Sequence, residues 1–237
     1  MSKEKVVIVG GSSGIGLASA QRLAREGYAV VISARSQERL DRALPSIGNG
    51  AAGLVLDYTD QASIQRFFAA LGAFDHLLLV ANTPAPWGGG FRELKTEALT
   101  ASFDKFWGYF HCLQAALPAL RKDGSIAVVT GAAARAALPG TAGLAAVNGA
   151  IERMAITLAK ELAPLRVNVL SPGVVDTPAH DWMPVEKKQE MLQGAAAYLP
   201  AQRYGRVEDL AEALLFLVRE RFITGSILDV DGGARMG

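Results

Sequence analysis

Residues 6–27, VVIVGGSSGIGLASAQRLAREG, have the pattern of a buried strand, a glycine-rich turn and a helix, in that order. Gly10 permits a tight turn, while Gly14 and Gly16 let the backbone approach a diphosphate and let the helix pack closely on the sheet. Free N–H groups at the start of the helix then face the anion. A glycine motif in this context predicts a dinucleotide-binding site.

The rest of the chain repeats this strand–helix unit. Helical patterns alternate with seven short apolar runs, at 5–9, 29–33, 52–56, 76–81, 125–130, 166–170 and 226–230. Strands that are apolar throughout are typical of a parallel sheet covered by helices on both faces. We therefore expect residues 1–237 to form one doubly wound α/β domain of the Rossmann type. The connection at 178–205 is unusually long, which predicts a lid over the substrate.

Composition narrows the class of protein further. The formal net charge is +1, with 24 basic and 23 acidic residues interspersed, which argues against nucleic acid or an anionic membrane as a partner. The single cysteine, Cys112, cannot form an intrachain disulfide, and no apolar run reaches the ~20 residues of a membrane span. No spacing of His, Cys, Asp or Glu indicates a metal site. We expect a cytoplasmic protein without a metal.

The end of the second predicted strand favours NADP(H) over NAD(H). An NAD site places a carboxylate there for the ribose 2′-hydroxyl. This chain has Ala34 followed by Arg35, and the planar arginine fork suits the oxygens of a 2′-phosphate. Ser12 or Ser13 could add hydroxyl donors. The alternative is that Arg35 is an ordinary surface charge.

With these pieces the chain resembles the short-chain dehydrogenase/reductase family. Residues 10–16 are similar to the family's TGxxxGIG turn, although Val9 stands at the threonine position, and SPGVVDT at 171–177 matches the PGxxxT segment. RVNVLSPG and ITGSILDVDGG are also close matches. Together with the turn, the resemblance implies the following cofactor-binding residues: Gly10, Ser12, Ser13, Gly14, Ile15, Gly16, Arg35, Ser36, Asp57, Tyr58, Ala81, Asn82, Asn148, Pro172, Gly173, Val175 and Thr177.

The resemblance also implies a catalytic Asn, Ser, Tyr and Lys, and this chain differs at all four positions. In TAGLAAVNGA (141–150) the Tyr and Lys positions fall on Leu144 and Asn148. The Ser position falls on Gly131 and the Asn position on Lys105. Leu144 cannot transfer a proton, and Asn148 carries no charge that would lower a neighbour's pKa. The family's standard proton-transfer mechanism is therefore absent.

Other residues could replace that chemistry. Lys105 and Tyr109 are four apart on one helical face, so the lysine could lower the pKa of the phenol, or both could pack at a subunit interface. Arg135, in the loop after the fifth strand, could clamp a substrate carboxylate or stabilise a developing negative charge, or face solvent. In the predicted lid, His180 could donate a proton, or Trp182 and its neighbours could simply cover the site.

Hydride transfer does not need an acid when the acceptor takes no proton at that moment. Iminium ions, enones and activated carbonyls meet this condition. We therefore predict an NADP(H)-dependent oxidoreductase that acts on such a small molecule by a non-standard mechanism. One alternative is a non-redox cyclase or isomerase that uses the nucleotide as a wall of its pocket, and another is a nucleotide sensor. The family resemblance further implies a homodimer or homotetramer.

Overall fold

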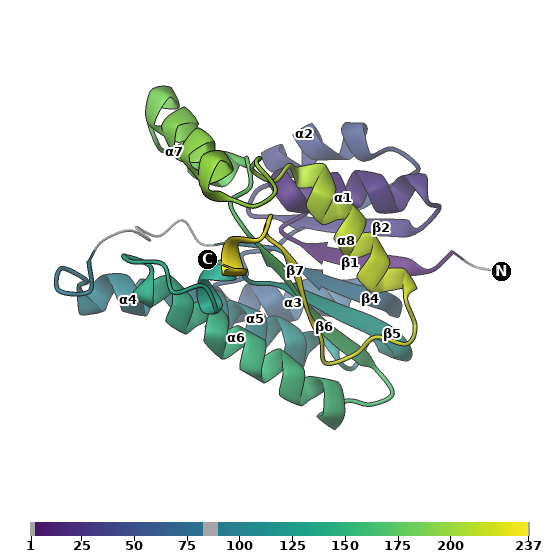
Figure 1. Cartoon of the computed structure of the whole chain (residues 1–237). Coiled ribbons are helices and arrows are strands. Elements are labelled where there is room, and N and C mark those ends of the chain that lie inside the picture. The colour runs from purple at the N-terminus through teal and green to yellow at the C-terminus, as the bar shows by residue number, and fades with distance from the viewer. Residues whose placement is uncertain (1–2, 83–89, 237) are drawn as a thin grey trace.

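The computed structural model describes residues 3–82 and 90–236, and these residues contain one parallel sheet of seven strands (Figure 1). The spatial order is β3-β2-β1-β4-β5-β6-β7. The strands are β1 Lys5–Val9, β2 Ala29–Ala34, β3 Ala52–Val55, β4 Phe74–Leu79, β5 Leu120–Val129, β6 Arg166–Pro172 and β7 Ile227–Val230. The strand order reverses beside β1, and such a switch point is where ligands bind in open α/β sheets.

The helices connect these strands in the order that a doubly wound sheet requires. They are α1 Gly14–Arg25, α2 Gln37–Ile47, α3 Gln61–Leu71, α4 Thr96–Ser102, α5 Asp104–Ala116, α6 Ala142–Glu161, α7 Val185–Tyr198 and α8 Val207–Arg219. Short 3₁₀ turns lie at η1 Ala132–Ala134, η2 Pro178–His180 and η3 Ala234–Met236. The predicted fold class is confirmed, and each of the seven predicted runs overlaps a strand. The main difference is that β5 starts earlier than predicted, because Leu120 already pairs with Phe74 of β4.

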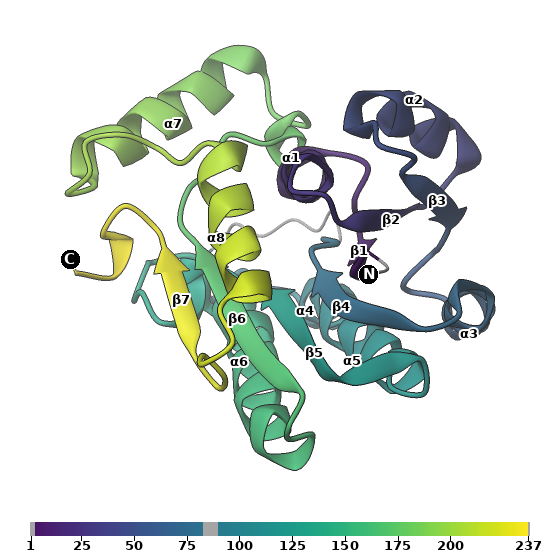
Figure 2. The same cartoon turned by 90° about the vertical axis from the view of Figure 1, so that its right-hand side faces the viewer.

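Helices cover both faces of the sheet (Figure 2). One face packs on α1, α2 and α8, where Ile8 and Ile32 meet Leu23 and Leu214. The other face packs on α3, α5 and α6. Successive strand residues point to opposite faces, so strands that are apolar at every position supply both cores.

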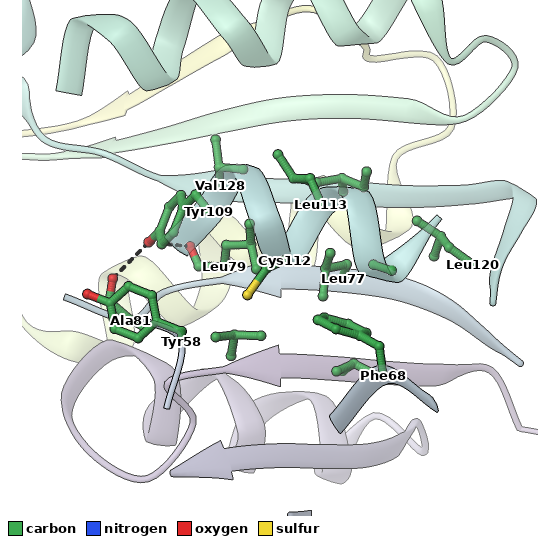
Figure 3. Close-up of a cluster of buried hydrophobic side chains, with 14 of the residues drawn as sticks. Tyr58, Phe68, Leu77, Leu79, Ala81, Tyr109, Cys112, Leu113, Leu120 and Val128 are labelled. Atoms are coloured by element: carbon green, nitrogen blue, oxygen red, sulfur yellow. Dashed lines mark hydrogen bonds between the residues drawn. The ribbon is translucent and has the colours of Figure 1, made fainter. Parts of the chain in front are cut away.

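The second core contains the single cysteine (Figure 3). Cys112 lies on α5 among Leu77, Leu113 and other apolar side chains of this cluster. Burial raises the pKa of its thiol to about 12, so the thiol stays protonated at neutral pH. This environment supports the interpretation of Cys112 as a structural residue rather than a nucleophile.

The long connection after β6 holds a helix of its own. In Figure 1, α7 lies beyond the carboxyl edge of the sheet, apart from the layers of helices that cover its faces. Val175 and Gly205 form an isolated parallel bridge that brings the two ends of this segment together. Only Leu192 is buried within α7, so the helix is held by few apolar contacts, and its role as a lid stays a prediction. In the described part of the chain, no helix combines the length and apolar content needed to span a membrane.

Candidate functional site

In the glycine-rich turn after β1, the backbone of the turn and the backbone at the start of α1 approach each other closely. Gly10 and Gly14 have φ angles of 88° and 52°, a region that glycine occupies without a steric penalty. A Cβ on Gly16 would lie 2.0 Å from the Gly10 carbonyl oxygen, so α1 could not approach the turn with any larger residue there. The Gly10 amide donates to Ser33 Oγ at 3.1 Å, which ties the turn to β2.

The segment at 171–177 lies against the same turn. A Cβ built on Gly14 would be 3.6 Å from Thr177 Cβ and 3.5 Å from Pro178 Cδ. Position 173 also needs a glycine, because a Cβ there would lie 2.7 Å from Asp231 Cα in the chain after β7. Ser13 is the N-cap residue of α1 but makes no side-chain cap bond there. These glycines form a cradle that side chains would fill, at the start of a helix, and this arrangement fits a diphosphate.

Residues at the ends of β2 and β3 line one side of this site. Arg35 is exposed, and Ser36 caps α2 by accepting a hydrogen bond from the Arg39 amide at 3.4 Å. The Asp57 carboxylate accepts from Thr59 Oγ1 at 2.7 Å and from the Thr59 amide at 3.0 Å. These bonds, with the nearby Arg35 charge, hold the Asp57 pKa below its ordinary value. Asp57 is therefore an anion that Arg35 faces.

One of the predicted cofactor-binding residues, Tyr58, has its side chain in the core. The Tyr58 side chain is buried, and its ring centroid lies 6.4 Å from that of Tyr109. A Cβ on Gly108 would come within 2.3 Å of the Tyr58 ring, so helix α5 packs directly on it. The ring therefore belongs to the core, and the prediction that Tyr58 binds cofactor stays a prediction, most simply met by its backbone. Ala81 and Asn82 follow β4 at the same edge.

Lys105 and Asn148, predicted to lie at two of the family's catalytic positions, contact each other. Lys105 Nζ on α5 donates to Asn148 Oδ1 on α6 at 3.1 Å, and the two residues are only 4 % and 1 % exposed. Burial lowers the Lys105 pKa to about 8. A Cβ on Gly131 would lie 3.2 Å from Asn148 Nδ2, so the glycine leaves room for the amide. Sequence reasoning missed this pair, although finding lysine and asparagine at each other's usual positions was an available signal.

Tyr109 does not play the part predicted for it. Its hydroxyl is held by the carbonyl oxygens of Leu79 at 2.9 Å, Ala81 at 3.0 Å and Val129 at 3.3 Å (Figure 3 shows the first two). Lys105 Nζ lies 5.6 Å from the centre of the Tyr109 ring, over its face. Burial raises the Tyr109 pKa well above its ordinary value. The predicted lowering of this pKa by Lys105 is therefore wrong, and the neutral phenol bridges the ends of β4 and β5.

Arg135 has carboxylate partners within the protein. Its guanidinium binds Asp229 through both Nη atoms, with Nη1 to Oδ2 at 2.9 Å, and its Nε lies 3.2 Å from Glu152 Oε2. Glu152 is 4 % exposed and accepts a hydrogen bond from Thr130 Oγ1 at 3.1 Å. Burial raises the Glu152 pKa despite the arginine. A role for Arg135 as a substrate clamp stays a prediction, and it would require this cluster to open.

The predicted lid residues lie at η2 and just after it. His180 is half-buried, and its Nδ1 has no hydrogen-bond partner among the described residues. Burial, with a smaller effect from the Lys188 charge, lowers the His180 pKa. Trp182 is exposed. Lys188 bridges Asp176 at 2.8 Å and Asp181 at 2.9 Å, which links α7 to both sides of η2. Proton donation by His180 stays a prediction.

Known proteins share both this sequence pattern and this architecture. The family model described as Enoyl-(Acyl carrier protein) reductase matches residues 9–235. The 3-oxoacyl-(acyl-carrier-protein) reductase FabG of Thermotoga maritima is 31% identical, with 96% of each chain covered. The short-chain dehydrogenase/reductase ucsE of Acremonium sp. is 30% identical, with 99% of this chain and 96% of the relative covered.

A solved structure extends this likeness to the whole fold. The crystal structure of a small-chain dehydrogenase in complex with NADPH is 33% identical, with a TM-score of 0.87 and 100% of both chains covered. The match therefore includes the glycine-rich turn, the segment at 171–177 and the positions of Lys105 on α5 and Asn148 on α6. This chain belongs to the short-chain dehydrogenase/reductase family of oxidoreductases.

Proposed function

We propose that the chain is an NADP(H)-dependent oxidoreductase that reduces an activated small-molecule acceptor without a Tyr–Lys pair. One observation carries the proposal: the chain has a glycine cradle that fits a diphosphate, and its resemblance to the family puts Leu144 and Gly131 at the positions of the proton-transferring residues. A protein that used the nucleotide only as a structural element would not need the segment at 171–177 against the glycine turn. The solved relative in complex with NADPH supports the same cofactor here.

Arg35 supports the choice of NADP(H) over NAD(H). It is exposed at the end of β2, where its guanidinium is free to meet a 2′-phosphate. Titration of NADPH, NADP⁺, NADH and NAD⁺ by calorimetry tests the proposal. We expect the two phosphorylated forms to bind more tightly, with NADPH preferred over NADP⁺. No binding of any of the four nucleotides would refute the proposal.

The chemistry follows from what the site lacks. NADPH, when bound, supplies a hydride, and the chain must then manage the charge on the acceptor. Leu144 has no proton to give, and Tyr109 is neutral and held by carbonyl oxygens within the core. General acid catalysis is worth roughly 10²–10⁴-fold, so reduction of a simple ketone loses about that factor. Iminium ions, enones and activated carbonyls escape most of the loss.

A labelled hydride donor tests this reaction. The purified protein is incubated with NADPH deuterated on the transferring face and with a cyclic iminium, an enone, a quinone or a simple ketone. We expect deuterium in the product from at least one activated acceptor and little product from the ketone. Conversion of an acceptor without deuterium would instead favour a non-redox cyclase or isomerase. Ketone reduction as fast as that of the activated acceptors would refute the proposed mechanism.

We also propose that the protein forms a homodimer or homotetramer through α5. Phe106, Trp107, Phe110 and His111 form a cluster of aromatic rings on this helix, and Trp107 is 52 % exposed. The other three residues are partly buried, and an aromatic cluster with an exposed tryptophan is typical of a protein–protein interface. Light scattering after size exclusion tests this, with Trp107→Glu expected to yield monomers and wild type to yield dimers or tetramers. A monomeric wild type would refute it.

A further inference from the structure

The buried lysine on α5 has a charge that the described part of the chain does not neutralise. Within residues 3–82 and 90–236, no carboxylate lies within ion-pair distance of Lys105 Nζ, and its hydrogen bond goes to the neutral Asn148 amide. The adjacent Tyr109 contributes only its ring face. Burying an unpaired charge is costly. A cation kept at such a position points to a ligand that carries or develops negative charge.

The lysine also determines which way the Asn148 amide faces. An ammonium group can only donate hydrogen bonds, so the amide must turn Oδ1 toward Lys105. Nδ2 then faces Gly131, 3.2 Å from the position of a Cβ there, and the Pro172 carbonyl oxygen lies 3.9 Å from that same position. None of the described residues accepts a hydrogen bond from Nδ2. A donor of a residue only 1 % exposed is thus aimed at the space beside Gly131, just after the end of β5.

We infer that Asn148 Nδ2 donates to the carbonyl oxygen of a conjugated carbonyl substrate, and that Lys105 is the positioning residue behind it. The inference rests on the proposed function and narrows its acceptor class. Hydride added to the β-carbon of an enone forms a C–H bond and moves the π electron pair onto the carbonyl oxygen. Asn148 meets the oxygen that becomes negative, and a proton from water completes the reduction at the α-carbon.

The Lys105 charge discriminates among the acceptors left open above. When Nδ2 donates a hydrogen bond to the substrate oxygen, that oxygen lies roughly 7 Å from Lys105 Nζ. At an effective dielectric constant of about 20, a full negative charge on the oxygen interacts with the ammonium strongly enough to change a rate or affinity by roughly 50-fold. The enolate oxygen gains from this field. A cationic iminium is repelled by it. The geometry therefore favours enones and quinone-like carbonyls over iminium ions.

The titratable groups around this pair come from both helices. Tyr109 on α5 has a pKa raised well above its ordinary value, and Cys112 on the same helix titrates at about 12. Glu152, one turn after Asn148 on α6, lies beside Arg135, and burial raises its pKa. Lys105 is the group of this set with a pKa of about 8. A loss of rate above that pH consequently reports Lys105.

The test compares 2-cyclohexen-1-one with the iminium form of 2-methyl-1-pyrroline, using deuterated NADPH at saturation. Wild type is expected to transfer deuterium to the enone at least tenfold faster. Asn148→Asp, which keeps an acceptor for Lys105 but removes the donor, is expected to lower kcat for the enone about 100-fold. Lys105→Met is expected to lower kcat at pH 7 by roughly 50-fold and to lose the decline of kcat above pH 8. Lys160→Met, at an exposed position of α6, is the matched control and should behave as wild type.

Several outcomes would overturn the inference, and they differ from failure of the proposed function. If wild type labels no acceptor, the proposed function fails and the inference fails with it. If wild type labels the iminium as fast as the enone, hydride transfer stands and the inference is wrong. It is also wrong if Asn148→Asp weakens NADPH binding but leaves kcat at saturation unchanged, because Nδ2 would then serve the cofactor rather than the substrate.

Discussion

Replacing Lys105 with methionine should make the protein more stable. Methionine has a similar length and no charge, so it fits the same buried space on α5. The pKa of about 8, against 10.5 for a free lysine side chain, means that keeping this group protonated in the folded state costs about 3 kcal/mol at pH 7. The lost hydrogen bond to Asn148 offsets about 1 kcal/mol. We expect a net gain of about 2 kcal/mol in the free energy of unfolding, or roughly 4–8 °C in Tm.

The pH dependence provides an independent sign test. Between about pH 8 and 10.5 the unfolded chain keeps the lysine proton that the folded chain has released, so the stability of wild type rises with pH. The Lys105→Met variant has no such contribution. Its advantage over wild type should therefore narrow by about 1 kcal/mol between pH 7 and pH 9.

Urea unfolding followed by circular dichroism at pH 7 and pH 9 measures both effects. Lys160→Met is the control, since it removes an exposed lysine from α6 and should change the unfolding free energy little at either pH. A lower stability of Lys105→Met at pH 7 would refute the reasoning. A stability gain of Lys105→Met over wild type that is equal at the two pH values would refute the reasoning as well. The cost of burying Lys105 would then not depend on its proton.

Three further predictions concern other residues of the site. Arg135→Ala should lower the unfolding free energy by about 2 kcal/mol, because Glu152 and Asp229 lose their shared cation, and an unchanged Tm would favour the substrate-clamp role instead. Tyr109→Phe should lower the free energy of unfolding by about 1–2 kcal/mol in thermal unfolding, because buried carbonyl oxygens lose their donor. Its kcat should stay within a few-fold of wild type. A 100-fold loss in kcat would identify the phenol as the acid. Arg35→Ala should raise the Kd for NADPH about tenfold or more in calorimetry and leave the Kd for NADH nearly unchanged. An equal effect on both nucleotides would argue against recognition of the 2′-phosphate by Arg35.

The sequence was sufficient for the fold because its signals are local. Apolar runs of strand length alternate with helical patterns, and the glycines at 10, 14 and 16 stand where close backbone approach requires them. The same local signals led to the nucleotide site. They gave no sign that the ring of Tyr58, next to the predicted cofactor acid Asp57, would lie in the core against Gly108. Whether a side chain just after a strand points into the core or toward the cofactor site depends on which helix packs against that end of the strand.

What the sequence determined by itself was the doubly wound architecture and the NADP(H) type of cofactor, and it predicted a chain without the family's proton-transferring tyrosine. The tertiary structure alone decided what the remaining polar residues do. Lys105 meets Asn148 across 43 positions of the chain, and Arg135 meets Asp229 across 94. Such pairs depend on how α5, α6 and β7 pack, and no local pattern encodes that packing. Burial lowers the Lys105 pKa and raises that of Tyr109, and the hydrogen bond from Lys105 determines which way the Asn148 amide faces.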